Sequence, residues 1–84
     1  MKKVTVYSTP SCPYCIAAKD LLTKLEVPFE SVDLSQDQEL RTSLSQKYNW
    51  MSVPMIVIGD EFIGGFDDMK KLHQSNELLP KINA

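Results

Sequence analysis

The sequence predicts an α/β fold with the element order βαβαββα, in which one mixed sheet of four strands is covered by three main helices. In the first half of the chain, short apolar runs rich in β-branched residues alternate with apolar positions at helical spacing. This alternation is typical of a parallel βαβ unit with a right-handed crossover. In the second half, two apolar runs are separated only by Gly59-Asp60, which indicates an antiparallel hairpin. We expect the hairpin to extend the parallel pair into a mixed sheet with helices on both faces.

The first three expected elements make up the βαβ unit. Residues 4–7 (VTVY) combine β-branched and aromatic side chains, as buried strands do. The next helix has one apolar face, formed by Ala18, Leu21, Leu22 and Leu25. These positions follow the i, i+3, i+4, i+7 spacing of a helix, which ends at Val27-Pro28. Residues 29–33 are expected to form the second strand.

A second helix is predicted after this unit. Ser35 and Gln38 have the spacing of a capping box, the sequence signature of a helix N-terminus. The apolar positions that then recur at helical spacing are Leu40, Leu44 and Tyr48. We expect this helix to end near Tyr48-Asn49.

The hairpin and a third helix complete the expected order. The hairpin strands are residues 55–58 and 61–63, and Gly64-Gly65 interrupts the second of them. Asp67-Asp68 then precedes a further helical stretch. Acidic residues are favoured in the first turn of a helix because they oppose its dipole, so the third helix is predicted to begin here.

Composition and charge exclude several classes of protein. The 84 residues suffice for one small domain and carry a net charge of −2, with the two signs interspersed. Such a pattern argues against nucleic acid and against an anionic membrane as partners. No apolar run approaches the ~20 residues that cross a bilayer, and residues 4–7 are too few for the apolar part of a secretory signal. We therefore expect a cytoplasmic location.

Both cysteines of the chain lie in one motif, Cys12-Pro13-Tyr14-Cys15, between the first strand and the first helix. Cys12 stands where the N-cap of the helix would be, and Pro13 suits the first helical position. The unpaired N–H groups and the dipole at a helix N-terminus stabilise a thiolate. Cys15 lies one turn further on, in position to close a disulfide ring. The motif therefore predicts a dithiol that cycles between reduced and oxidised states.

The alternatives for the cysteine pair are a coincidental buried pair and half of a zinc site. Zinc requires four ligands as a rule, and His73 is the only histidine beside the two cysteines. Redox chemistry is therefore favoured over metal binding, and no metal site is predicted. His73 itself is expected to be a solvated helix residue, since thiolate exchange needs no imidazole.

Three motifs together resemble the glutaredoxin family, whose members have the thioredoxin fold. They are Cys12-Pro13-Tyr14-Cys15, Ser52-Val53-Pro54 and Gly64-Gly65-Phe66-Asp67-Asp68. The resemblance covers nearly the whole chain, so residues 1–84 are expected to form a single glutaredoxin domain.

The resemblance implies an enzyme, a glutathione-linked thiol–disulfide oxidoreductase that reduces protein disulfides and glutathione mixed disulfides. Cys12 would be the attacking thiolate and Cys15 the resolving thiol, which forms an internal disulfide with Cys12. The implied partners are glutathione, as co-substrate, and disulfide-containing or glutathionylated proteins. We expect a monomer without a bound cofactor.

The resemblance also implies a glutathione site. Pro54 would follow a cis peptide bond, so that the backbone of Val53 faces the substrate and pairs with it like an added strand. The γ-glutamyl carboxylate would lie at the N-terminus of the third helix, with the Asp67 side chain facing the ammonium group. The residues implied to bind glutathione are Tyr14, Ser52, Val53, Pro54, Gly65, Phe66, Asp67 and Asp68.

Two positions depart from the family pattern and keep other functions open. Thr9 and Trp50 stand where many glutaredoxins carry basic or amide residues that would face the glycine carboxylate of glutathione, and Lys47 is a more distant substitute. Trp50 either lies partly exposed near the site or packs under the second helix. One alternative function is a glutaredoxin-like redoxin reduced by thioredoxin reductase. Another is a scaffold for an iron–sulfur cluster, against which Pro13 and Cys15 both argue.

Overall fold

A four-stranded mixed sheet forms the middle layer of the computed structural model, which describes residues 2–84. Its strands are β1 (Val4–Ser8), β2 (Phe29–Asp33), β3 (Met55–Ile58) and β4 (Glu61–Gly64). They are arranged in the order β2-β1-β3-β4. β1 pairs with β2 in parallel, and the β1–β3 and β3–β4 pairs are antiparallel. The predicted mixed sheet is thus confirmed.

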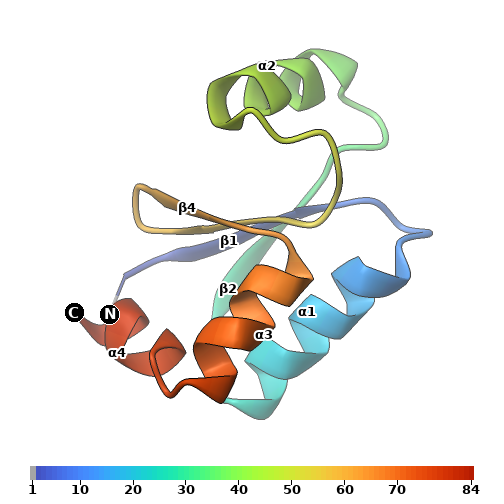
Figure 1. Ribbon diagram of the computed structural model, residues 1–84. Helices are drawn as coiled ribbons and strands as arrows, with labels where there is room; N and C mark the ends of the chain where they lie inside the picture. The colour runs from blue at the N-terminus through green and yellow to red at the C-terminus, as the bar shows by residue number, and fades with distance from the viewer. Residues whose placement is uncertain (1) are drawn as a thin grey trace.

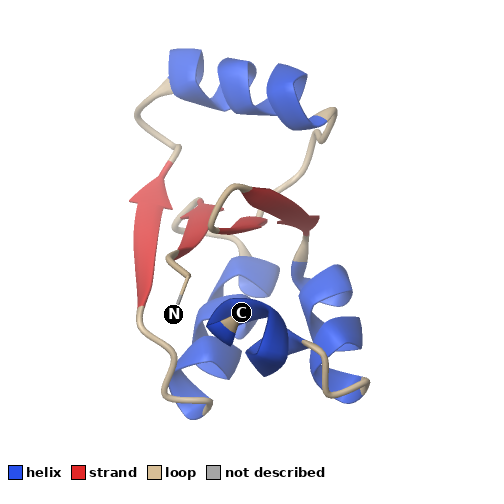
Figure 2. Cartoon of the chain, turned by 90° about the vertical axis from the view of Figure 1, so that its left-hand side faces the viewer, coloured by secondary structure: helices blue, strands red, loops and turns tan. Residues whose placement is uncertain are grey.

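Helices cover both faces of this sheet, as Figures 1 and 2 show. The helix α2 (Gln38–Tyr48) lies alone on one face. On the opposite face lie α1 (Pro13–Lys24) and α3 (Phe66–Gln74), which contact each other. A short helix, α4 (Leu78–Asn83), lies beside the start of the chain, where the Lys2 N–H donates to the Ile82 carbonyl over 2.7 Å. No helix within residues 2–84 is long and apolar enough to cross a membrane.

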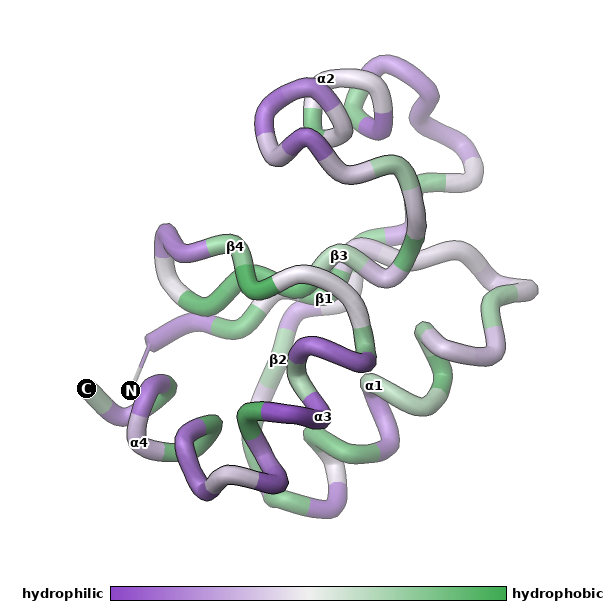
Figure 3. The backbone as a smooth tube through the Cα atoms, viewed as in Figure 1, coloured by the Kyte–Doolittle hydropathy of each residue, from purple (hydrophilic) through white to green (hydrophobic). Residues whose placement is uncertain are grey.

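Each face of the sheet has its own hydrophobic cluster. The cluster toward α1, α3 and α4 contains Val6, Leu22, Ile56 and Met69, all fully buried. The cluster toward α2 is smaller and centres on Leu34, Leu44 and Met55. Figure 3 shows the hydrophobic residues following β3 and its neighbours through the middle of the molecule. The sheet is therefore fixed from both sides, which gives a rigid base to the loops at its edge.

The start of α2 differs from the prediction. The N-cap is Asp37, whose Oδ1 accepts a hydrogen bond from the Leu40 N–H over 3.0 Å. Ser35 belongs to the preceding turn, in which its N–H donates to Asp33 Oδ1 over 2.8 Å. The capping box at Ser35 and Gln38 was therefore a wrong prediction. Aspartate caps a helix as well as serine does, and the turn at Asp33 already engages the backbone of Ser35.

The helix α4 was not predicted either. It has only six residues, so its periodicity is limited to one buried pair, Leu78 and Ile82. Pro80 within it suggests a break, but the structure places Pro80 in the first turn. A first-turn proline is tolerated because its missing N–H would have no acceptor in the helix.

Candidate active site

Cys12 caps the N-terminus of α1, as the sequence predicts. Its backbone is extended (φ −99°, ψ 109°), and its Sγ accepts a hydrogen bond from the Cys15 N–H over 3.1 Å. Pro13 occupies the first turn, where no N–H is needed. The Cys12 side chain is half-buried, so its sulfur is held at the helix terminus and remains within reach of a substrate.

Cys15 lies in a different environment although it is only one helical turn away. Its side chain is fully buried, with 1% of its surface exposed. Burial raises the pKa of the Cys15 thiol from 9.0 to about 11, and the hydrogen bond with Cys12 acts in the same direction. A buried thiol is disfavoured as an anion because the apolar interior solvates charge poorly. Cys15 is therefore protonated at neutral pH.

The loop before β3 meets Cys12 from the other side. The peptide bond between Val53 and Pro54 is cis, which confirms the expectation from the resemblance. The Cys12 thiol donates to the carbonyl oxygen of Val53, with 3.6 Å between the sulfur and the oxygen. The loop backbone and the sulfur therefore lie side by side, although they are 41 residues apart in sequence.

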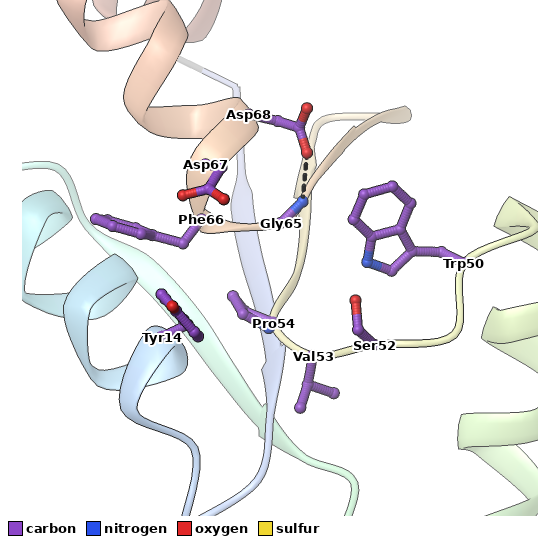
Figure 4. A pocket seen from close by; sticks show the side chains of 9 residues that line it. All are labelled: Tyr14, Trp50, Ser52, Val53, Pro54, Gly65, Phe66, Asp67 and Asp68. Atoms are coloured by element: carbon purple, nitrogen blue, oxygen red, sulfur yellow. Dashed lines mark hydrogen bonds between the residues drawn. The ribbon is translucent and has the colours of Figure 1, made fainter.

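A cavity of about 290 Å³ opens next to this contact, between the loop and the start of α3 (Figure 4). Eight of its lining residues are those that the resemblance implied for glutathione, and the ninth is Trp50. The full lining is Tyr14, Trp50, Ser52, Val53, Pro54, Gly65, Phe66, Asp67 and Asp68. Three separate segments thus meet at one cavity, and Val53 joins it to the sulfur of Cys12.

The two aspartates at the start of α3 are oriented differently. The Asp68 Oδ2 accepts a hydrogen bond from the Gly65 N–H over 3.0 Å, which closes the first turn of the helix. Gly64, with a φ of +123°, lies directly against the Asp68 carboxylate, so that a side chain at Gly64 would collide with it. Asp67 is exposed and takes part in no ion pair between the described residues. Figure 4 shows its carboxylate turned toward the Phe66 and Tyr14 side of the cavity.

Trp50 lies at the site and also packs under α2, so both placements left open by the sequence are correct. Its ring meets Phe62 edge-on, with 5.5 Å between the centroids, and Phe62 in turn stacks on Tyr48. On the other side its Cζ2 atom faces Gly65. Trp50 therefore forms the wall of the cavity next to the start of α3. The sequence could not decide between the two placements, because they depend on the contact with Phe62, twelve positions further on.

The other two positions singled out for a carboxylate partner do not line the cavity. The Lys47 Nζ lies over the Tyr48 ring, 5.3 Å from its centroid. Thr9 accepts from the Cys12 N–H through its carbonyl oxygen over 3.4 Å. The only charged residues among those that line the cavity are Asp67 and Asp68. Within residues 2–84, no group of three or more His, Cys, Asp and Glu side chains is arranged to hold a metal ion.

Comparison with known proteins agrees with this geometry. The family model described as Glutaredoxin matches residues 4–63. A glutaredoxin from Pseudomonas aeruginosa is 40% identical over 84 residues, covering 100% of both chains. The holo form of glutaredoxin C1 from Populus tremula x tremuloides superposes with a TM-score of 0.92 at 35% identity, covering 98% of this chain and 77% of the other. A buckwheat glutaredoxin–glutathione complex superposes with a TM-score of 0.91 at 28% identity, covering 95% of this chain and 76% of the other.

Proposed function

The chain belongs to the glutaredoxin family and is a thiol–disulfide oxidoreductase, and on this premise we propose that glutathione is its electron donor. The proposed substrates are protein disulfides and glutathione mixed disulfides. The observation that carries the proposal is the cavity beside Cys12, which combines the exposed Asp67 carboxylate with the N-terminus of α3. A γ-glutamyl head carries one ammonium and one carboxylate, and these two features complement both charges.

The proposed placement of glutathione follows from the three segments around the cavity. The Val53 N–H and carbonyl would pair with the cysteinyl residue of glutathione in the manner of an added strand. The γ-glutamyl carboxylate would accept from the N–H groups of Phe66 and Asp67, and the Asp67 side chain would face the ammonium. Tyr14, which is 62% exposed, would lie beside the mixed disulfide. Asp68 would act indirectly, because its carboxylate holds the Gly65 backbone.

The chemistry divides between the two cysteines. The Cys12 thiolate attacks one sulfur of a substrate disulfide, and the other sulfur departs as a thiolate that takes up a proton. When Cys12 carries a glutathionyl group, the thiolate of a second glutathione attacks the glutathionyl sulfur. Oxidised glutathione forms and Cys12 is released. When Cys12 carries a protein, Cys15 loses its proton and attacks the Cys12 Sγ. The protein thiol leaves, and two glutathione molecules then reduce the Cys12–Cys15 disulfide.

The contact between Cys12 and Val53 places the attacking sulfur beside the backbone that would pair with the substrate. In the dithiol form the Val53 carbonyl accepts from the Cys12 thiol. Once Cys12 has lost its proton and reacted, its sulfur no longer donates to this carbonyl. The Val53 carbonyl is then available to the N–H of the bound cysteinyl residue, so that the backbone pairing and the mixed disulfide form together.

Buckwheat glutaredoxin supports glutathione as ligand because its structure was solved as a glutathione complex and its backbone resembles this one closely. A dithiol that donates electrons must be kept reduced, which favours the cytoplasm as the working compartment. We further propose that the protein acts as a monomer on disulfide-containing or glutathionylated proteins.

The identity of the electron donor is tested by reducing the oxidised protein in parallel with glutathione plus glutathione reductase and with thioredoxin reductase. Consumption of reduced nicotinamide cofactor in the glutathione arm alone supports the proposal. Reduction by thioredoxin reductase alone would refute it and establish the second function. Visible absorbance after anaerobic purification would instead indicate an iron–sulfur cluster.

A further inference from the structure

Trp50 carries a hydrogen-bond donor that nothing in the described part of the chain uses. The Nε1 atom of its indole is buried and has no hydrogen-bond partner within residues 2–84. An indole N–H can only donate, and buried donors in folded proteins are almost always paired. A donor left unpaired in the wall of a cavity therefore points to an acceptor on a ligand.

The orientation of the ring directs this donor toward the cavity. Figure 4 shows the Trp50 nitrogen on the edge of the indole that faces Ser52 and Pro54. The same edge carries Cζ2, which faces Gly65. Gly65 directly precedes the first turn of α3, so the indole edge lies next to the backbone that is proposed to hold the γ-glutamyl carboxylate.

The charge of the cavity limits which groups could hold a carboxylate there. Among its nine lining residues there are two aspartates and no cation. A carboxylate bound there gains no ion pair from the lining and must be held by neutral N–H groups. The first turn of α3 supplies some of these, and the Trp50 Nε1–H is a further donor on the facing wall. An N–H donor to a carboxylate makes a stronger hydrogen bond than it makes to a neutral acceptor.

We propose that Trp50 is a specificity-determining residue, whose Nε1–H donates to the α-carboxylate of a bound γ-glutamyl head. This inference rests on the proposed function, because it assumes that the cavity takes glutathione. It adds a contact that selects thiols with a γ-glutamyl group over thiols without one. The contact stabilises the bound substrate and the transition state equally. Its loss therefore raises KM and leaves kcat unchanged.

The variant Trp50→Phe removes the N–H and keeps an aromatic ring against Phe62. Two mixed disulfides of one peptide serve as substrates, one with glutathione and one with cysteamine, which has no γ-glutamyl head. We expect Trp50→Phe to raise KM for the glutathione substrate about tenfold, the size of a hydrogen bond to a charged group, with kcat unchanged. With glutathione at a saturating concentration as reductant, the cysteamine substrate should react as with the wild type, because it has no γ-glutamyl head. A fold defect would instead affect both substrates.

A measurement on the wild-type protein keeps the inference testable without a variant. Trp50 is the only tryptophan, so a ¹⁵N-labelled sample gives one indole N–H resonance. Titration with the unreactive S-methylglutathione should shift this proton downfield. An analogue with the γ-glutamyl α-carboxylate converted to a carboxamide should shift it less.

The outcomes separate this inference from the proposed function. If S-methylglutathione binds but both ligands move the indole resonance equally, or if Trp50→Phe keeps the wild-type KM for the glutathione substrate, the role of Trp50 is refuted and the proposed function stands. If S-methylglutathione does not bind at all, the proposed function fails and the role of Trp50 fails with it.

Discussion

The buried thiol of Cys15 makes a quantitative prediction about stability in alkaline solution. Its pKa is raised by burial from 9.0 to about 11 in the folded protein. Below pH 9 the thiol is protonated in both the folded and the unfolded chain, so the full contribution to stability is present. Between pH 9 and pH 11 the unfolded chain loses this proton while the folded protein keeps it, which stabilises the unfolded chain. The contribution is therefore lost as the pH rises through the folded-state pKa.

The size of the loss follows from the shift. Each pKa unit corresponds to about 1.4 kcal/mol, so a rise from 9.0 to about 11 corresponds to at most about 3 kcal/mol. For a domain of this size that is a large part of the total stability, which is about 5–15 kcal/mol in most proteins. The loss of unfolding free energy is thus large enough to be distinguished from the effect of titrating surface groups.

The assay compares two reduced variants by urea unfolding from pH 7.5 to 11. Cys12→Ser prevents the internal disulfide and keeps Cys15, whereas Cys12→Ser with Cys15→Ala lacks the buried thiol. We expect the free energy of unfolding of the first variant to fall by up to about 3 kcal/mol more than that of the second. Parallel pH curves for the two variants would refute the assignment of a raised pKa to a buried Cys15 thiol.

Three further predictions concern the site. Cys15→Ser should keep the reduction of glutathione mixed disulfides, which needs only one protein sulfur, and lose the reduction of protein disulfides. Both activities are measured on the folded variant, and an equal loss of the two would contradict separate one-cysteine and two-cysteine routes. Asp67→Asn should raise KM for glutathione substrates about tenfold through loss of a charge-assisted contact, while its urea midpoint stays near that of the wild type. An unchanged KM would show that Asp67 does not contact glutathione. Gly64→Ala should destabilise the fold by about 1–3 kcal/mol, because an alanine is strained at φ +123° and its Cβ would also collide with the Asp68 carboxylate. The matched control Gly65→Ala, at φ −95°, should cost less in the same unfolding assay, and equal losses would show that neither the left-handed backbone nor the Asp68 contact is the cause.

Local spacing was enough to predict the cysteine motif and most of the fold. A cap at Cys12 and a first-turn Pro13 depend on neighbouring residues only, and the structure confirms both. The strands β2 and β3 have the predicted bounds. For β3 this is because its apolar run ends at the turn residues Gly59 and Asp60. The same reasoning failed at α2, where Asp37 and Ser35 compete as caps and sequence does not show which backbone groups are already engaged.

The candidate site could be predicted only through the resemblance, because its residues come from three distant segments. No spacing rule brings Tyr14, Ser52 and Asp67 to one cavity. The resemblance does not predict the role of Trp50. This residue departs from the family pattern in sequence, but its contacts with Phe62 and Gly65 come from tertiary packing. The unpaired state of its N–H is likewise visible only in three dimensions.

Two pairs of similar residues in this protein are separated in function by their surroundings. Cys12 and Cys15 differ because the first faces the loop at Val53 and the second is enclosed by the core. Asp67 and Asp68 differ because the second is engaged by the Gly65 N–H and the first is not. We propose that Cys12 and Asp67 are the members that meet the substrate, whereas Cys15 reacts only with Cys12 and Asp68 acts through the Gly65 backbone. Because the two members of each pair have the same side chain, it is burial and hydrogen bonding, and not residue type, that separate them.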